Sequence, residues 1–173
     1  MQARGTTFDA FSLRGVLLLT WAYGVVHSLI RLIAGTQLAM DDPKENVFTQ
    51  AWQWGYLPDN PPLFEWLLTS VQVATGPVLV SFLIVKYGLL VFSACFVFLA
   101  GRRLYGEDRW AAVTTYSALL LYQLGWNYHQ AFTHSLVVIA ATCFCFWALL
   151  RLCQERRLQD YLLFGLAVGL GLL

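Results

Sequence analysis

The sequence predicts an all-α fold, a polytopic transmembrane helical bundle that carries two interfacial helices in its first outer loop. The first observation is compositional: of 173 residues, 58% are hydrophobic and 12% are charged, whereas soluble domains contain about 25% charged residues. The second is that apolar residues gather in runs of about twenty, the length that a helix needs to cross a bilayer. A disordered chain is therefore excluded, and a water-soluble domain is disfavoured. A net charge of +1 also argues against a nucleic-acid partner.

Five apolar runs are predicted to be spans. In chain order they cover 15–34, 78–101, 110–126, 135–152 and 158–173. The last of them is still apolar where the sequence stops. A helix that ended inside hydrocarbon would leave carbonyl groups without hydrogen-bond partners, at a cost of several kcal/mol each. We therefore expect the chain to be the N-terminal part of a longer multi-pass protein, with its fifth span truncated.

Basic residues are unevenly divided between the loops, and this predicts the orientation. Consecutive spans place 1–14, 102–109 and 151–160 on one side, which carries eight arginines. The other side, formed by 35–77 and 127–134, carries a single lysine. The positive-inside rule puts the arginine-rich side, with the N-terminus, in the cytoplasm. We expect a protein of the plasma (inner) membrane in which the long first loop is extracytoplasmic.

The loop at 35–77 contains the start signal of a short helix. Asp42 is suited to cap it, Pro43 to occupy its first turn and Glu45 to complete the cap from the third position. Apolar side chains then recur at helical spacing over 47–52. This pattern predicts an amphipathic helix that lies in the membrane interface.

A second short helix is predicted after a proline-rich turn. Pro61 and Pro62 start it, and Gly76 with Pro77 ends it, because proline suits a first helical turn but cannot continue a helix. We expect this helix to lie beside the first one, at the outer membrane face.

Five carboxylates of this loop are candidates for chemistry, since a carboxylate can act as a base toward a hydroxyl or can ligate a metal ion. Asp42 and Glu45 are explained by capping. Asp41 lies outside the helix and has no such explanation. Asp59 either caps the turn before the prolines or takes part in chemistry, and Glu65 is expected on a solvated face.

Several short motifs resemble those of one family. They are Asp41-Asp42, Gln50, Gly55-Tyr56, Asp59-Asn60-Pro61-Pro62-Leu63 with Trp66, Arg102-Arg103-Leu104-Tyr105-Gly106 and Thr133-His134-Ser135. Together they resemble the bacterial GT-C membrane glycosyltransferases related to the aminoarabinose transferase and the protein O-mannosyltransferases. Members of that family often carry a basic residue in place of Asn60 and an acidic residue in place of His134.

This resemblance implies a GT-C-like bundle and an inverting transferase. Such an enzyme would move a hexosyl or pentosyl group from a polyprenyl-phosphate carrier to a lipid, glycan or protein acceptor, on the extracytoplasmic face and in contact with membrane lipids. By the same resemblance, Asp41 is the catalytic base or the carboxylate of a metal site. Asp59 is the acidic residue before the prolines, a substrate-binding position. The resemblance requires no cofactor, although a divalent cation at Asp41 is compatible with it.

Basic side chains near the outer ends of the spans are candidates for binding the carrier phosphate. In sugar transfer the phosphate leaves as an anion, and a cation stabilises the negative charge that develops on it. Lys86 lies about 12 Å into the second span at about 1.5 Å per residue, so we expect a partner, either a buried carboxylate or a lipid phosphate. Arg31 either reaches the interface by snorkelling or binds substrate. His134, in the outer turn with His129, is either an ordinary polar loop residue or a contact for acceptor or carrier.

Two other functional classes remain open. A transporter would place ionisable residues near the bilayer midplane on broken helices, and Lys86 approaches that depth. A non-catalytic membrane scaffold would carry the acidic loop without using it. Sugar transfer from a polyprenyl-phosphate donor by the full-length protein would distinguish both classes from a glycosyltransferase, whereas the truncated chain by itself need not be active.

Overall fold

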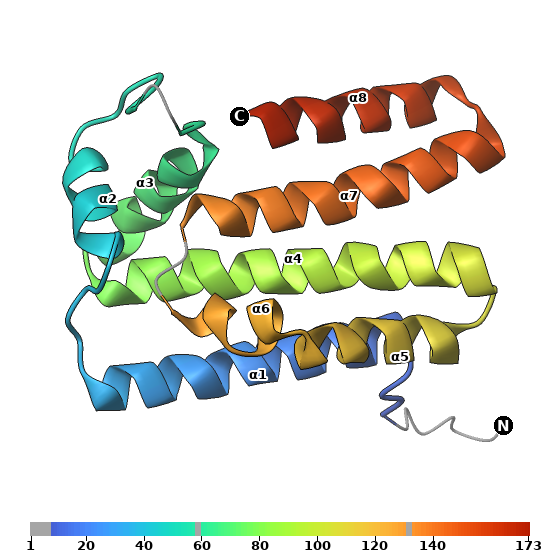
Figure 1. Cartoon of the computed structure of the whole chain (residues 1–173), viewed down its shortest axis with the longest axis horizontal. Coiled ribbons are helices and arrows are strands. Elements are labelled where there is room, and N and C mark those ends of the chain that lie inside the picture. Colours follow the sequence, from blue (N-terminus) through green and yellow to red (C-terminus); the bar gives the residue numbers. More distant parts are fainter. Residues whose placement is uncertain (1–7, 58–59, 131–132) are drawn as a thin grey trace, which may run out of the picture.

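The structure is a computed structural model that describes residues 8–57, 60–130 and 133–173, and its regular elements are helices. Three long helices lie side by side: α1 (Leu13–Ala34), α4 (Leu79–Tyr105) and α7 (His134–Glu155). Helix α4 lies between the other two, and α8 (Leu158–Leu172) runs back along α7 (Figure 1). The predicted all-α membrane fold is confirmed.

Helices α1, α4 and α7 are long and apolar enough to cross a membrane. Their 22, 27 and 22 residues correspond to about 33 to 40 Å at about 1.5 Å per residue, against a hydrocarbon core of about 30 Å. Local signals set their ends. The hydroxyl of Ser12 accepts a hydrogen bond from the Gly15 amide at 3.1 Å and so caps α1. Gly106, with φ 75°, ends α4 in the left-handed conformation that glycine adopts readily.

Helix α4 is the core of the bundle because it packs against α1, α7, α3 (Leu63–Thr75) and α5 (Asp108–Ser117). Its contact with α1 is close at Gly24. A Cβ atom built on Gly24 would lie 2.9 Å from the Cβ of Tyr87, so glycine is the residue that lets the two helices approach. Near the start of α4, Phe82, Leu83 and Leu90 join one apolar cluster with residues of α3 and α7.

The predicted span 110–126 is not one continuous helix. The chain there forms α5 (Asp108–Ser117), a 3-10 helix (Ala118–Leu120), α6 (Tyr122–Gly125) and a second 3-10 helix (Asn127–His129). Leu121 has an extended backbone, with φ −69° and ψ 130°, and this breaks the helical path. The break lets the next residues turn toward α4, where Tyr128 is buried and its hydroxyl donates to the Lys86 carbonyl oxygen at 2.8 Å.

The two helices expected in the first loop are α2 (Asp42–Phe48) and α3 (Leu63–Thr75). They lie at one end of the bundle, beside the end of α1 and the starts of α4 and α7 (Figure 1). Helix α2 is shorter than the apolar pattern predicts, because the chain after it turns back toward α3. The Trp66 indole donates to the Gln53 carbonyl oxygen at 2.9 Å, and Trp52 stacks on Trp66 with ring centroids 5.8 Å apart.

The arginine-rich segments meet at the opposite end of the bundle (Figure 1). There Arg103 contacts Glu155 at 2.6 Å, and Arg102 contacts Asp108 at 3.0 Å. The structure therefore gathers at one end the basic turns that the sequence assigns to one side of the membrane. The acidic loop lies at the other end.

Two glycines of the bundle provide a test of this packing. Gly24→Ala should lower the thermal unfolding midpoint of the full-length protein in detergent, because the added carbon meets the backbone-proximal part of Tyr87 and forces α1 away from α4. Gly88→Ala, where a Cβ would meet nothing within 4 Å, is the matched control and should leave the midpoint unchanged or raise it, since alanine favours helix. Equal shifts in the two variants would contradict the close contact.

Candidate functional site

A polar cavity of about 340 Å³ opens between α1, the start of α2 and the first turns of α4. The titratable and amide side chains among its lining residues are His27, Arg31, Asp42, Lys86, Tyr87, His129 and Gln130. These residues come from four separate parts of the chain, so only the folded bundle brings them together. Of the residues predicted from the sequence, Lys86 and Arg31 line this cavity.

Asp42 is the carboxylate of this cavity. It is 6% exposed, and burial raises its pKa, while the positive charges of Lys86 and Arg31 act in the opposite direction. The sequence assigned Asp42 to the N-cap of α2, and that assignment is wrong: Asp42 is the first residue of the helix, and Asp41 occupies the cap position. Its side chain is turned into the cavity because α2 packs against the bundle end.

Asp41 has a different environment from its neighbour. It is exposed, and its side chain makes no capping hydrogen bond. It stands between Met40 and Asp42, both of which line the cavity, but it is not itself part of the lining. Asp41 is therefore a solvent-facing carboxylate next to a buried, charged cavity.

Lys86 is 7% exposed although its side chain carries an ammonium group. The ammonium donates a hydrogen bond to the backbone carbonyl oxygen of Gln130 at 2.5 Å. The sequence analysis expected a carboxylate or a phosphate as its partner. In the structure the partner is a backbone carbonyl, and Asp42 is the carboxylate close enough to influence it electrostatically.

Arg31 has a structural role as well as a place in the cavity wall. Its guanidinium donates to the carbonyl oxygens of Gly35 at 2.7 Å and Gln37 at 2.6 Å. These bonds tie the loop that leaves α1 to the end of that helix. The guanidinium has five N–H donors, so two such bonds do not exhaust its capacity to bind an anion.

His129 is held tightly beside Lys86. Its Nε2 lies 2.6 Å from the Tyr23 hydroxyl and its Nδ1 lies 3.0 Å from the Tyr87 hydroxyl. Its ring also stacks on His27, with centroids 3.9 Å apart. Burial, with the nearby His27 and Lys86, lowers the pKa of His129 to about 4. At neutral pH the ring is therefore uncharged, and one nitrogen donates while the other accepts.

A second polar cluster lies apart from this cavity and contains His134. The His134 Nε2 is 3.4 Å from Glu45 Oε1 and 3.7 Å from Glu65 Oε1. Glu45 is 1% exposed and Glu65 is 0% exposed, and burial raises the pKa of Glu65. The expected solvated position of Glu65 is wrong, because α3 packs against α4 and α7 and turns this carboxylate inward. Glu45 takes part in no side-chain cap of α2.

Asp59, the remaining residue predicted for the site, lies outside the described residues. The sequence reasoning also missed that Glu45, Glu65 and His134 meet. Their helical positions could be read from the sequence, but nothing in the sequence specifies that α2, α3 and the start of α7 converge.

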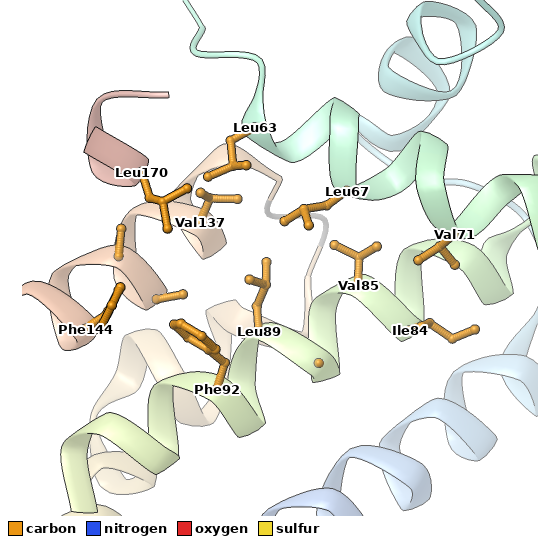
Figure 2. Close-up of a pocket in the computed structure, with 13 residues that line it drawn as sticks. Leu63, Leu67, Val71, Ile84, Val85, Leu89, Phe92, Val137, Phe144 and Leu170 are labelled. Carbon is orange, nitrogen blue, oxygen red and sulfur yellow. The ribbon is translucent and has the colours of Figure 1, made fainter. Parts of the chain in front are cut away.

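An apolar cavity of about 380 Å³ lies between α3, α4, α7 and α8. Figure 2 shows Leu67 of α3 and Val85 of α4 pointing into it, with Phe92, Phe144 and Leu170 to one side of them. Its lining residues carry no titratable side chain, so this cavity can hold hydrocarbon but cannot perform proton transfer or bind a phosphate.

Comparisons with known proteins place the chain in a family. Residues 59–173 match the family model described as dolichyl-phosphate-mannose-protein mannosyltransferase. The chain belongs to this family. Two curated relatives are the lipopolysaccharide core galacturonosyltransferases RgtA and RgtB of Rhizobium johnstonii, which are 31% identical over 156 residues and 28% identical over 152 residues. No solved structure matches the chain significantly.

The relatives are much longer than the chain. The alignments cover 90% and 88% of this chain but 31% of each relative, so the chain spans about a third of the length of the curated relatives that it matches. Family membership confirms the resemblance to the GT-C membrane glycosyltransferases. Together with the three long apolar helices, it makes the chain part of an integral membrane protein.

The environment of His129 predicts a pH dependence of stability. Its pKa is lowered from 6.5 to about 4 in the fold, so the unfolded chain binds a proton more readily between these values. Stability should therefore fall as the pH drops from about 7 to about 4. His129→Gln, which does not titrate, should flatten this decline, as measured by the thermal unfolding midpoint of the full-length protein in detergent.

His27 and His134 are still present in the His129→Gln variant, so its unfolding midpoint also depends on pH. The test therefore compares the slope of the midpoint against pH in the wild type with the slope in the variant. A variant slope identical to that of the wild type would show that His129 is not held neutral by the fold.

Proposed function

We propose that the chain forms part of a membrane glycosyltransferase that moves a sugar from a polyprenyl-phosphate carrier to an acceptor hydroxyl at the extracytoplasmic face. The observation that carries this proposal is the polar cavity, in which Lys86 and Arg31 face the buried carboxylate of Asp42 beside the acidic first loop. Family membership supports the same reaction class. The same membership disfavours a transporter.

The cavity suits the leaving group of this reaction. A polyprenyl phosphate leaves as a stable anion, so its departure requires positive charge rather than a general acid. Lys86 and Arg31 supply that charge from α4 and α1. Lys86 lines the cavity together with the apolar residues Leu79, Phe82 and Leu83. An anion bound in the cavity would offset the free-energy cost of burying the Lys86 ammonium group.

The acceptor hydroxyl requires a base, and we assign that role to Asp41. A base must reach a substrate that arrives from outside, and Asp41 is exposed with no capping bond to hold it. Asp42 has the complementary role: it is buried and balances the charge of Lys86. Asp59, through the resemblance described above, and His134, through its place in the outer turn, are the further substrate-binding candidates of this face.

The names of the relatives guide the choice of substrates. Both are named as lipopolysaccharide core galacturonosyltransferases. A polyprenyl-phosphate galacturonate donor and a lipopolysaccharide core acceptor are therefore the first substrates to assay, ahead of other hexosyl or pentosyl donors. We further propose an inverting reaction, since direct attack by the acceptor on the sugar carbon from the face opposite the phosphate needs one base and no covalent intermediate.

The division between the two aspartates is testable by radiolabelled sugar transfer with full-length protein in membranes. Asp41→Asn should lower kcat by about 10²-fold or more while leaving the thermal midpoint unchanged, because a base is lost without a packing change. Asp42→Asn should lower the midpoint, because it removes the negative charge that offsets the buried ammonium group of Lys86. Glu107→Gln, at the opposite end of the bundle and exposed, is the control and should behave as the wild type.

Unchanged sugar transfer by the Asp41→Asn protein would overturn its assignment as the base. Failure of the full-length wild type to transfer any polyprenyl-linked sugar, in a preparation that is folded, would favour a non-catalytic scaffold.

The orientation is testable by cysteine labelling in a Cys153→Ser background, since Cys153 is exposed. Lys44→Cys, in the acidic loop, should react with an impermeant thiol reagent added to intact spheroplasts, and Arg156→Cys should react only after the membrane is opened. The physical reason is the positive-inside rule applied to the arginine-rich end. Labelling of both positions from outside, or of Arg156→Cys alone, would overturn the proposed orientation.

A further inference from the structure

We propose that Glu45, Glu65 and His134 form a binding site for a divalent transition-metal ion, with Zn²⁺ the ion that this donor set favours. The three side chains come from α2, α3 and the first residue of α7. The proposal does not depend on the polyprenyl-phosphate reaction, because these residues lie outside the lining of the polar cavity.

The spacing of the donor atoms fits a metal ion. One donor atom from each side chain lies within 4.8 Å of the other two. The His134 Nε2 is 3.4 Å from Glu45 Oε1 and 3.7 Å from Glu65 Oε1. Ligands bound to Zn²⁺ at about 2.0–2.2 Å in a tetrahedral arrangement are separated from one another by roughly 3.3–3.6 Å. The observed separations therefore leave room for an ion at the centre after a small adjustment.

The side chains are buried, and most of their polar atoms form no hydrogen bond with the described residues. The buried side-chain atoms without a hydrogen bond include Glu45 Oε2, both Glu65 carboxylate oxygens and both His134 ring nitrogens. Glu45 and Glu65 are 1% and 0% exposed. A buried polar group without a partner costs about 1–3 kcal/mol, and more if it is charged. An ion among them would satisfy several of these atoms at once.

The charge balance also points to a cation. Within the described part of the chain, His134 is the one basic side chain within 4.0 Å of either glutamate. Carboxylates at the other end of the bundle are paired directly with arginine, as Glu155 is with Arg103 at 2.6 Å. The two buried carboxylates therefore share one imidazole and, among the described residues, have no arginine beside them of the kind that pairs with Glu155.

A network of shared protons is the competing explanation. Hydrogen bonds between charged nitrogen and oxygen are about 2.7–2.9 Å long, whereas the two contacts of His134 are 3.4 and 3.7 Å. The contacts are too long for such bonds and are suited to ligands that share an ion. An imidazole ligand favours Zn²⁺ over Mg²⁺ or Ca²⁺, which prefer oxygen donors.

The site would fasten the first loop to the bundle. Glu45 and Glu65 belong to the two helices of that loop, and His134 belongs to the long helix α7. Glu45 also lies one helical turn after Asp41, and its amide donates to the Asp41 carbonyl oxygen at 3.1 Å. An ion bound here would hold the segment that carries Asp41 in a fixed position, with the fourth coordination position left to water or another ligand.

The test is the metal content of purified full-length protein after Zn²⁺ loading and desalting, measured by inductively coupled plasma mass spectrometry. The wild type should retain about one Zn²⁺ per chain at this site. Glu65→Gln and His134→Gln should each weaken Zn²⁺ affinity by about 10²-fold or more, because each removes a direct ligand. Glu107→Gln and His129→Gln are matched controls from elsewhere in the chain and should retain the ion.

Thermal unfolding gives a second measurement that does not depend on the variants. A chelator should lower the unfolding midpoint of the wild type, and added Zn²⁺ should restore it. Equal Zn²⁺ retention by the wild type and Glu65→Gln would overturn the site, and so would a wild type that binds no Zn²⁺ and whose midpoint ignores the chelator.

Discussion

The burial of Lys86 in the central helix is the constraint around which this end of the bundle is arranged. An ammonium group inside a membrane helix is costly unless polar groups surround it. Here the surroundings are the Gln130 carbonyl oxygen, which accepts a hydrogen bond from the ammonium group, and Asp42, which brings a negative charge. Both come from segments outside the long helices, so the position of Lys86 fixes where those segments must lie.

The broken path between α5 and α7 follows from the same constraint. Helix α5 packs against α4, and the break at Leu121 brings Tyr128, His129 and Gln130 against α4 beside Lys86. His129 is then locked between the hydroxyls of Tyr23 and Tyr87. The segment is therefore not a continuous span, and its residues His129 and Gln130 form a polar wall of the cavity.

The acidic loop is divided by the fold into carboxylates with different tasks. Asp41 stays exposed, Asp42 faces the cations of the cavity, and Glu45 with Glu65 meets His134 in a separate cluster. A membrane transferase needs both a reactive carboxylate and a rigid loop to hold it, because small errors in position lower the rate strongly. The two buried clusters hold α2 through Asp42 and Glu45, which are three residues apart on that helix, and provide that rigidity.

The sequence by itself determined the helical membrane fold, the three long helices and the positions of both loop helices, because hydrophobic runs and proline or capping signals are local properties of the chain. It also singled out Lys86, since a charge in an apolar run needs an explanation wherever the helix packs. Tertiary structure alone decided which carboxylate faces Lys86, that Glu65 is buried rather than solvated, and that His134 joins Glu45. These depend on how α2, α3 and α7 converge, and helical periodicity specifies the face of a helix but not the element that will cover it.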